Sequence, residues 1–145
     1  MRTYTYRARI EPGEEAGFVV SFPDVPEAIT QGDNEADARA MAAEALGLAL
    51  LMYLKERRPL PKARVADQGL VPITVDPEDA AKIAVLEAFR DANLSQVELA
   101  RKLGKDPREV RRILDPMHAT KLPALKEALA ALGRRLVISV EEIAV

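Results

Sequence analysis

Alternating apolar and polar positions open the chain. Residues 3–10 place apolar side chains on one side and mostly threonine and arginine on the other, which is the period-two pattern of a half-buried strand. Residues 17–22 repeat this pattern after a polar turn that contains Pro12 and Gly13. The two segments are therefore predicted to form an antiparallel hairpin, and a short third strand is expected over residues 28–31.

A long helix is predicted next, from residue 35 to about residue 57, with Asp33 and Asn34 as candidate caps. Its polar positions form one narrow stripe, made by Asp37, Glu44 and Lys55. So narrow a stripe indicates that the helix packs on the sheet and also against something else. A neighbouring protomer and the chain's own loops both remain open for that second contact.

A fourth strand is predicted over residues 69–75, and Pro72 within it requires an edge position because proline cannot donate to a ladder. From residue 78 the period becomes helical, until residues 135–140 return to a strand-like alternation. The fold class is thus α+β: a β-β-β-α-β domain over residues 1–75, then a small all-α domain with a C-terminal strand over residues 76–145.

Two helix starts in the second half have the spacing of a helix-turn-helix. Capping boxes are predicted for Ser95 with Glu98 and for Asp106 with Glu109, eleven residues apart. Gly104 lies between them, where the chain must turn sharply. Counted from Gln96, the small and apolar positions follow the bihelical DNA-binding pattern at Leu99, Ala100, Leu103, Gly104, Val110 and Ile113.

Arginines dominate the second of these helices. Arg108 and Arg111 are predicted to contact base edges in a major groove, and Arg112 is predicted to point towards the sugar-phosphate backbone of the DNA. Gln96 can bond a phosphate at the start of the first helix. Lys105 departs from the pattern, because that position is usually apolar. The predicted DNA-binding residues are Gln96, Lys105, Arg108, Arg111, Arg112 and Lys121.

The distribution of charge agrees with a DNA-binding second half. Residues 94–135 hold ten Lys and Arg against five Asp and Glu, whereas residues 1–93 hold eleven against sixteen. A basic block within an acidic protein indicates an anionic partner for that block. His118, the one histidine, either stabilises its loop or contacts a phosphate.

The amino-acid composition excludes several classes of protein and of functional site. The 145 residues contain no cysteine, which excludes disulfides and thiolate chemistry, and with a single histidine no metal site is expected. The start of the chain lacks the apolar segment of a secretory signal, and the most apolar stretch, residues 45–54, is too short to span a bilayer, so a cytoplasmic protein with no membrane partner is expected. No carboxylate lies in the first strand and no Gly-rich phosphate loop is present, so neither an enzyme nor a cofactor is expected.

The segment GFVVSFPDVPEAITQGDNEADA, residues 17–38, resembles the signature of the HicB antitoxin family. The resemblance continues through ELARKLG at 98–104 and VRRILDP at 110–116, so it covers both halves of the chain. It implies a partial RNase H-like N-terminal domain that neutralises a small mRNA-cleaving toxin of the HicA type. It also implies a helix-turn-helix that represses the operon of the pair.

Within the resemblance, Asp24, Gln31 and Asp33 match the motif and are polar enough to contact the toxin. The chain differs from the family at two points in this segment. It has Glu27-Ala28 where Gly-Cys is usual, and Asn34 where the helix cap is usually Thr or Ser.

At least a dimer is expected, because one helix-turn-helix offers too few contacts for tight operator binding. Residues 135–140 could pair antiparallel with the same strand of a second copy, or dock back on their own domain. The alternative function is a free-standing dimeric repressor whose N-terminal domain senses a small ligand. A neighbouring reading frame for a small basic protein with a single histidine would favour the antitoxin.

Overall fold

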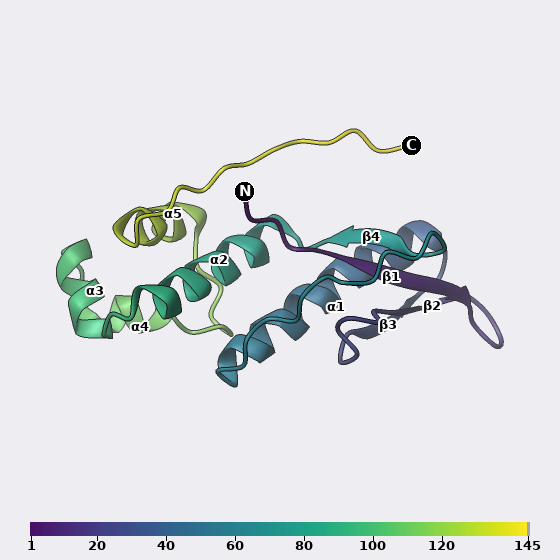
Figure 1. The fold of residues 1–145 in the computed structure, drawn as a ribbon, viewed down its shortest axis with the longest axis horizontal. Coiled ribbons are helices and arrows are strands. Elements are labelled where there is room, and N and C mark those ends of the chain that lie inside the picture. The colour runs from purple at the N-terminus through teal and green to yellow at the C-terminus, as the bar shows by residue number, and fades with distance from the viewer. Residues whose placement is uncertain (145) are drawn as a thin grey trace.

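The computed structural model describes residues 1–144, in which a sheet with one long helix lies beside a group of shorter helices (Figure 1). The strands are β1 (Thr5–Pro12), β2 (Phe18–Ser21), β3 (Ile29–Gly32) and β4 (Val71–Thr74). They form one antiparallel sheet in the order β3-β2-β1-β4. The α+β class, the hairpin and the β-β-β-α-β order are confirmed.

The sheet has one buried face. Tyr4, Tyr6 and Ala8 alternate inward from the β1 segment, and Tyr6 pairs in register with Ile73 of β4. Strand β4 lies at the edge of the sheet, as Pro72 requires. Proline has no N–H to donate, and at an edge this loses no hydrogen bond to a neighbouring strand.

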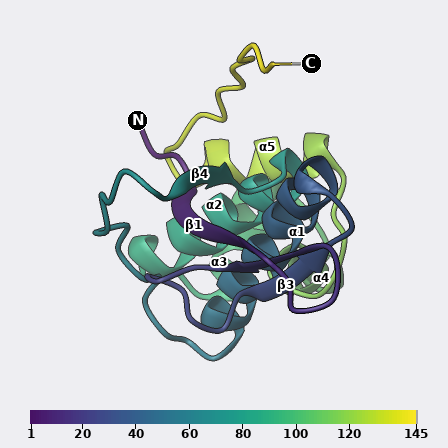
Figure 2. The ribbon, with the colours of Figure 1, turned by 90° about the vertical axis from the view of Figure 1, so that its right-hand side faces the viewer.

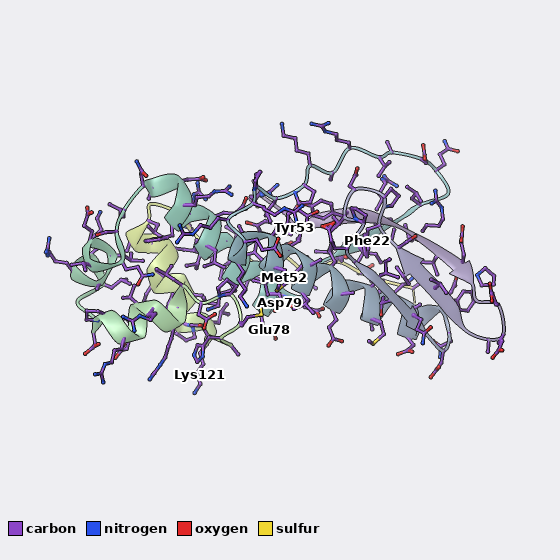
Figure 3. All side chains as sticks on the ribbon, turned by 90° about the horizontal axis from the view of Figure 1, so that it is seen from below. Phe22, Met52, Tyr53, Glu78, Asp79 and Lys121 are labelled. Atoms are coloured by element: carbon purple, nitrogen blue, oxygen red, sulfur yellow. The ribbon has the colours of Figure 1, made fainter. Side chains whose placement is uncertain are left out.

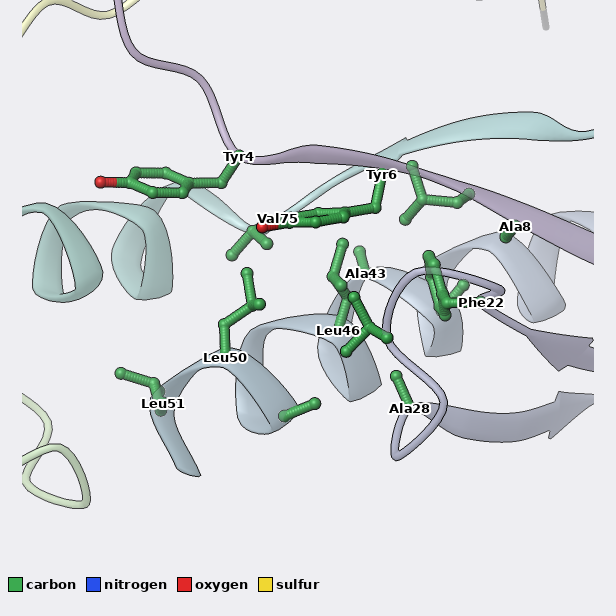
Figure 4. Close-up of a cluster of buried hydrophobic side chains, with 14 of the residues drawn as sticks. Tyr4, Tyr6, Ala8, Phe22, Ala28, Ala43, Leu46, Leu50, Leu51 and Val75 are labelled. Atoms are coloured by element: carbon green, nitrogen blue, oxygen red, sulfur yellow. The ribbon is translucent and has the colours of Figure 1, made fainter. Parts of the chain in front are cut away.

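Helix α1 (Glu35–Lys55) covers the inner face of the sheet (Figures 1 and 4). Asn34 is its N-cap, and the Asn34 side-chain oxygen accepts a hydrogen bond from the Asp37 N–H at 2.8 Å. Leu46 and Leu50 point from the helix towards Tyr4 and Tyr6 (Figure 4). Burying each such leucine contributes roughly 1.5–3 kcal/mol.

The second contact of α1 is helix α2 (Pro77–Ala92) of the same chain, which accounts for the narrow polar stripe. Ile83 and Leu86 of α2 belong to the same apolar cluster as the sheet and α1. The two helices approach closely at Gly47, where an added Cβ would lie 2.6 Å from the Asp79 carboxylate. The Tyr4 hydroxyl, just before β1, also donates to the Glu87 carboxylate of α2 at 2.6 Å.

Three short helices complete the second half: α3 (Gln96–Leu103), α4 (Pro107–Ile113) and α5 (Leu122–Ala131). On the side of α2 away from α1, Val85 and Ala88 pack with Leu125 and Leu129 of α5. Helix α2 therefore contributes one side to each of two apolar cores.

The predicted C-terminal strand does not form in the single chain. Residues 134–144 have neither helix nor strand, and they extend away from the body of the protein (Figures 1 and 2). Leu136 still packs on the α2–α5 core, but Val137, Ile138 and Val140 are exposed. A strand needs a partner for its backbone groups, and within residues 1–144 this segment has none.

Candidate DNA-binding and partner-binding surfaces

Helices α3 and α4 form a capped pair joined at Gly104. Gly104 has a left-handed backbone (φ 63°), which glycine adopts without steric cost. The Ser95 hydroxyl accepts from the Glu98 N–H at 3.1 Å, and the Glu98 carboxylate accepts from the Ser95 N–H at 3.3 Å. This confirms the first predicted capping box.

The second predicted capping box is wrong. The Asp106 carboxylate accepts the Arg108 N–H at 2.7 Å, so Asp106 does cap α4. The Glu109 carboxylate does not accept from the Asp106 N–H; it lies 3.9 Å from the Lys105 ammonium. This ion pair is long and the Glu109 side chain is exposed, so water supplies most of the partners of the carboxylate.

The interior of the pair follows the predicted spacing. Leu99, Ala100 and Val110 are buried together in a small cluster between α3 and α4, with Leu103 partly buried against it. The small side chain of Ala100 lets the two helices cross closely. Ile113 instead packs in the α2–α5 core, so α4 is held from both sides.

Three arginines occupy the outward face of α4. Arg108, Arg111 and Arg112 are all exposed, and at 3.6 residues per turn they fall within an arc of about 100°. Val110 and Ile113 lie on the opposite, buried side. None of the three guanidinium groups forms an ion pair with another residue between 1 and 144. The face thus presents uncompensated charge to solvent.

The other predicted DNA-binding residues have different surroundings. Lys105 is largely covered, and its ammonium lies 3.4 Å from the Glu127 carboxylate of α5, so its charge is already compensated. Gln96 is exposed at the first position of α3. Lys121 is exposed just before α5 and points outward (Figure 3). His118 is exposed in the loop after α4, and its backbone N–H closes a turn there.

Sequence reasoning missed Lys82, which lies beneath the end of α4. The residue is only 4% exposed, and its ammonium donates to the carbonyl oxygens of Ile113 at 2.7 Å and Arg112 at 3.2 Å. A third bond joins it to the Thr120 hydroxyl at 2.7 Å. These carbonyls belong to the last turn of α4, where no following turn of helix supplies N–H groups, and the Arg112 carbonyl also accepts the Asp115 N–H at 3.2 Å. Lys82 therefore fixes the C-terminal end of α4 onto α2.

Burial sets the protonation of this lysine. Removal from water lowers the pKa of Lys82 to about 8, and the nearby negative charge of Asp115 opposes the shift. The signal in the sequence was a lysine between the apolar residues Ala81 and Ile83, on a helix with other exposed positions for charge. Its partners could not be foreseen.

The three predicted toxin contacts do not share one role. The Asp24 carboxylate accepts the backbone N–H groups of Arg64 at 2.8 Å and Val65 at 3.0 Å, so it holds the connection between α1 and β4 in place. Gln31 and Asp33 are exposed at edge strand β3 and just after it. They are therefore free to contact a partner.

An apolar groove lies beside these residues, between β3 and α1. It has a volume of about 240 Å³, and Ile29 and Leu48 on its rim are 66% and 55% exposed. Met52 lies further along its wall, next to Tyr53 on α1 (Figure 3). The composition of α1 is a hint of this surface, because the helix has too few polar residues to be covered on one side only.

The departure from the family signature lies at one end of this groove. Ala28 is buried, whereas the Glu27 carboxylate accepts a hydrogen bond from the Tyr53 hydroxyl at 2.7 Å. The Arg58 guanidinium stacks over the Tyr53 ring, 4.0 Å from its centroid. Glu27 is thus part of a local polar cluster.

Within residues 1–144, no group of three or more His, Asp or Glu side chains is arranged to hold a metal ion. None of the helices in that range has the length and apolar character needed to cross a membrane.

Comparison with known proteins places this architecture. Residues 5–84, which include the first half of α2, match the model of the HicB-like antitoxin of bacterial toxin–antitoxin systems. The chain is 41% identical over 143 residues to Antitoxin HicB 1 of Photorhabdus laumondii, covering 97% of this chain and 90% of that protein. It is 38% identical over 135 residues to Antitoxin HicB of Escherichia coli K12, covering 90% of this chain and 95% of that protein.

The sheet, the long helix and these matches define the class of protein: an antitoxin of a bacterial toxin–antitoxin system. The chain belongs to the HicB antitoxin family.

Proposed function

We propose that the chain neutralises an mRNA-cleaving toxin of the HicA type with its N-terminal half and represses its own operon by binding operator DNA with α3 and α4. The observation that carries the DNA-binding part is the outward face of α4. Three arginines without ion pairs in the described chain stand on a short helix that is capped at one end and fixed by Lys82 at the other. Guanidinium groups on a rigid helix suit guanine edges and phosphates.

The toxin-binding part rests on β3 and α1. Gln31 and Asp33 supply exposed polar groups, and the adjoining groove supplies exposed apolar surface at Ile29 and Leu48. Residues 1–75 hold eleven Asp and Glu against nine Lys and Arg, and this acidic balance favours a basic, RNA-binding toxin. The proposed role is regulatory and not catalytic.

The DNA-binding part is tested with Arg108→Ala combined with Arg111→Ala. Specific binding to the promoter fragment should be lost in a gel shift, because each bidentate base contact contributes roughly 1–3 kcal/mol. The matched control is Arg9→Ala with Arg39→Ala, which removes the same charge from exposed positions in the N-terminal half. Unchanged operator affinity in the first variant would contradict the assignment of α4.

The toxin-binding part is tested by co-expression with a toxin of the HicA type. Wild type and the Arg108/Arg111 variant should both co-purify with it and both block its cleavage of RNA. A further variant, Ile29→Asp with Leu48→Asp, should bind DNA normally and fail to co-purify, since two charges cannot be buried in an apolar contact without a large cost.

A further inference from the structure

A second groove lies where the C-terminal end of α1 meets α2 and the helix-turn-helix. Its volume is about 380 Å³. The apolar lining is made by Leu54, Leu86, Phe89, Leu114 and Pro116. The polar lining is made by Lys55, Arg57, Arg90 and Gln96. Three cations and no carboxylate therefore line one hollow.

These cations are available to a partner. Lys55, Arg57 and Arg90 are exposed, and no ion pair within residues 1–144 includes Lys55 or Arg57. The Arg90 guanidinium lies 3.8 Å from the Asp91 carboxylate, a contact between two exposed side chains that contributes little. Arg57 holds a left-handed backbone (φ 58°), which turns the chain sharply just after α1. The groove is complementary to a polyanion.

The position of the groove beside the helix-turn-helix indicates that the polyanion is DNA. Gln96 is the first residue of α3, whose N–H groups suit a phosphate, and Leu114 and Pro116 directly follow α4. The groove therefore borders both helices of the pair that we propose to dock on DNA. Duplex DNA carries about one phosphate charge per 1.7 Å of its axis, so a surface beside a docked helix-turn-helix meets further phosphates.

We propose that Lys55 and Arg57, at the end of the long helix of the N-terminal half, bind the phosphate backbone of the operator next to the site read by α4. The inference rests on the proposed operator binding and extends it. Both halves of the chain then contact the DNA, although the N-terminal half is acidic overall. Arg90 and Gln96 continue the same contact towards α3.

The test is Lys55→Gln combined with Arg57→Asn in the full-length protein, since asparagine tolerates the left-handed backbone at position 57. Operator affinity is measured by fluorescence anisotropy over a series of salt concentrations. The slope of log affinity against log salt should fall by about 1 for each phosphate that the variant no longer neutralises. Operator and scrambled DNA should weaken by the same factor, because phosphates carry no sequence information.

Two controls accompany this variant. Lys55→Arg with Arg57→Lys keeps both charges and should keep the slope of wild type. Arg9→Ala with Arg39→Ala removes two charges elsewhere; Arg39 lies about 24 Å from Lys55 along α1 at 1.5 Å per residue. Thermal unfolding of each variant verifies that it is folded.

An unchanged salt slope in the Lys55/Arg57 variant, with operator binding still abolished by Arg108→Ala and Arg111→Ala, would overturn the groove contact and leave the proposed function intact. Loss of toxin binding with normal DNA binding would overturn it too, and would assign the groove to an acidic part of the toxin. Wild type that binds no operator DNA would overturn both the proposed function and this extension of it.

Discussion

The ammonium group of Lys82 lies 2.7 Å from the main-chain carbonyl oxygen of Ile113, the last residue of α4. A positive charge at this end of a helix interacts favourably with its dipole and satisfies carbonyls that the helix leaves unpaired. Helix α2, which carries Lys82, also packs on α1 through Ile83. One helix thus supports both the N-terminal core and the arginine-bearing helix.

The free energy of unfolding should rise with pH above the folded-state pKa of Lys82. Burial lowers this pKa from 10.5 to about 8, so between these values the unfolded chain binds more protons than the folded chain. Stability should therefore increase by up to about 1.4 kcal/mol per pH unit between about pH 8 and pH 9.5. Above that range the raised pKa of Tyr4 acts in the opposite sense, since the unfolded chain loses that proton first.

Urea unfolding of wild type and Lys82→Met at several pH values measures this effect. The methionine variant should lack the rise, because it has no group that titrates at this position. Parallel pH curves for the two proteins would show that the buried ammonium does not titrate near pH 8.

Gly47→Ala should destabilise the protein even though alanine is the better helix former. The new Cβ would lie 2.6 Å from the Asp79 carboxylate oxygen and 3.2 Å from its Cβ, and such overpacking typically costs about 1–3 kcal/mol. Asp79→Ala removes the 2.6 Å contact with the carboxylate and leaves the 3.2 Å contact with the Cβ, so Gly47→Ala should cost clearly less in that background. A double-mutant cycle by chemical unfolding measures the coupling. Strict additivity would mean that α1 and α2 do not meet here.

A fragment of residues 1–92 should be more stable than a fragment of residues 1–75. The longer fragment keeps Ile83 and Leu86 of α2 in the core of the sheet, which contributes roughly 3 kcal/mol or more for the two side chains. It also keeps the bond from Tyr4 to Glu87. Circular dichroism during urea unfolding measures the difference, and toxin pull-down shows whether each fragment binds. The 1–92 fragment with Ile83→Ala and Leu86→Ala is the control and should lose most of the gain.

Truncation after Leu136 should reduce the full-length protein from a dimer or higher oligomer to a monomer. Residues 137–144 include the exposed apolar side chains Val137, Ile138, Val140 and Ile143, which a second copy could cover. Leu136 stays in place, so the α2–α5 core remains complete. Light scattering over a concentration series gives the mass of both proteins. A truncated protein with the mass of wild type would place the contact between copies elsewhere.

Local patterns in the sequence were sufficient for most of the secondary structure. The alternation in β1, the Asn34 cap and the Ser95–Glu98 capping box each depend on residues within a few positions of one another. The spacing of Leu99, Ala100 and Val110 predicted the crossing of α3 and α4 for the same reason. Steric and hydrogen-bonding constraints between residues only a few positions apart can be deduced from the sequence.

Long-range pairings were decided only by the tertiary structure. Nothing near Lys82 in the sequence reveals Ile113 and Thr120 as its partners, and nothing near Asp24 reveals the N–H groups of Arg64 and Val65. The Glu109 carboxylate lies near the Lys105 ammonium and does not complete the expected capping box with Asp106. The same holds for the groove that joins Lys55 to Gln96 and for the unpaired segment after Leu136. Polar groups, charges and apolar surfaces find their partners among the residues that are close in the folded structure, and these residues can lie far apart in the sequence.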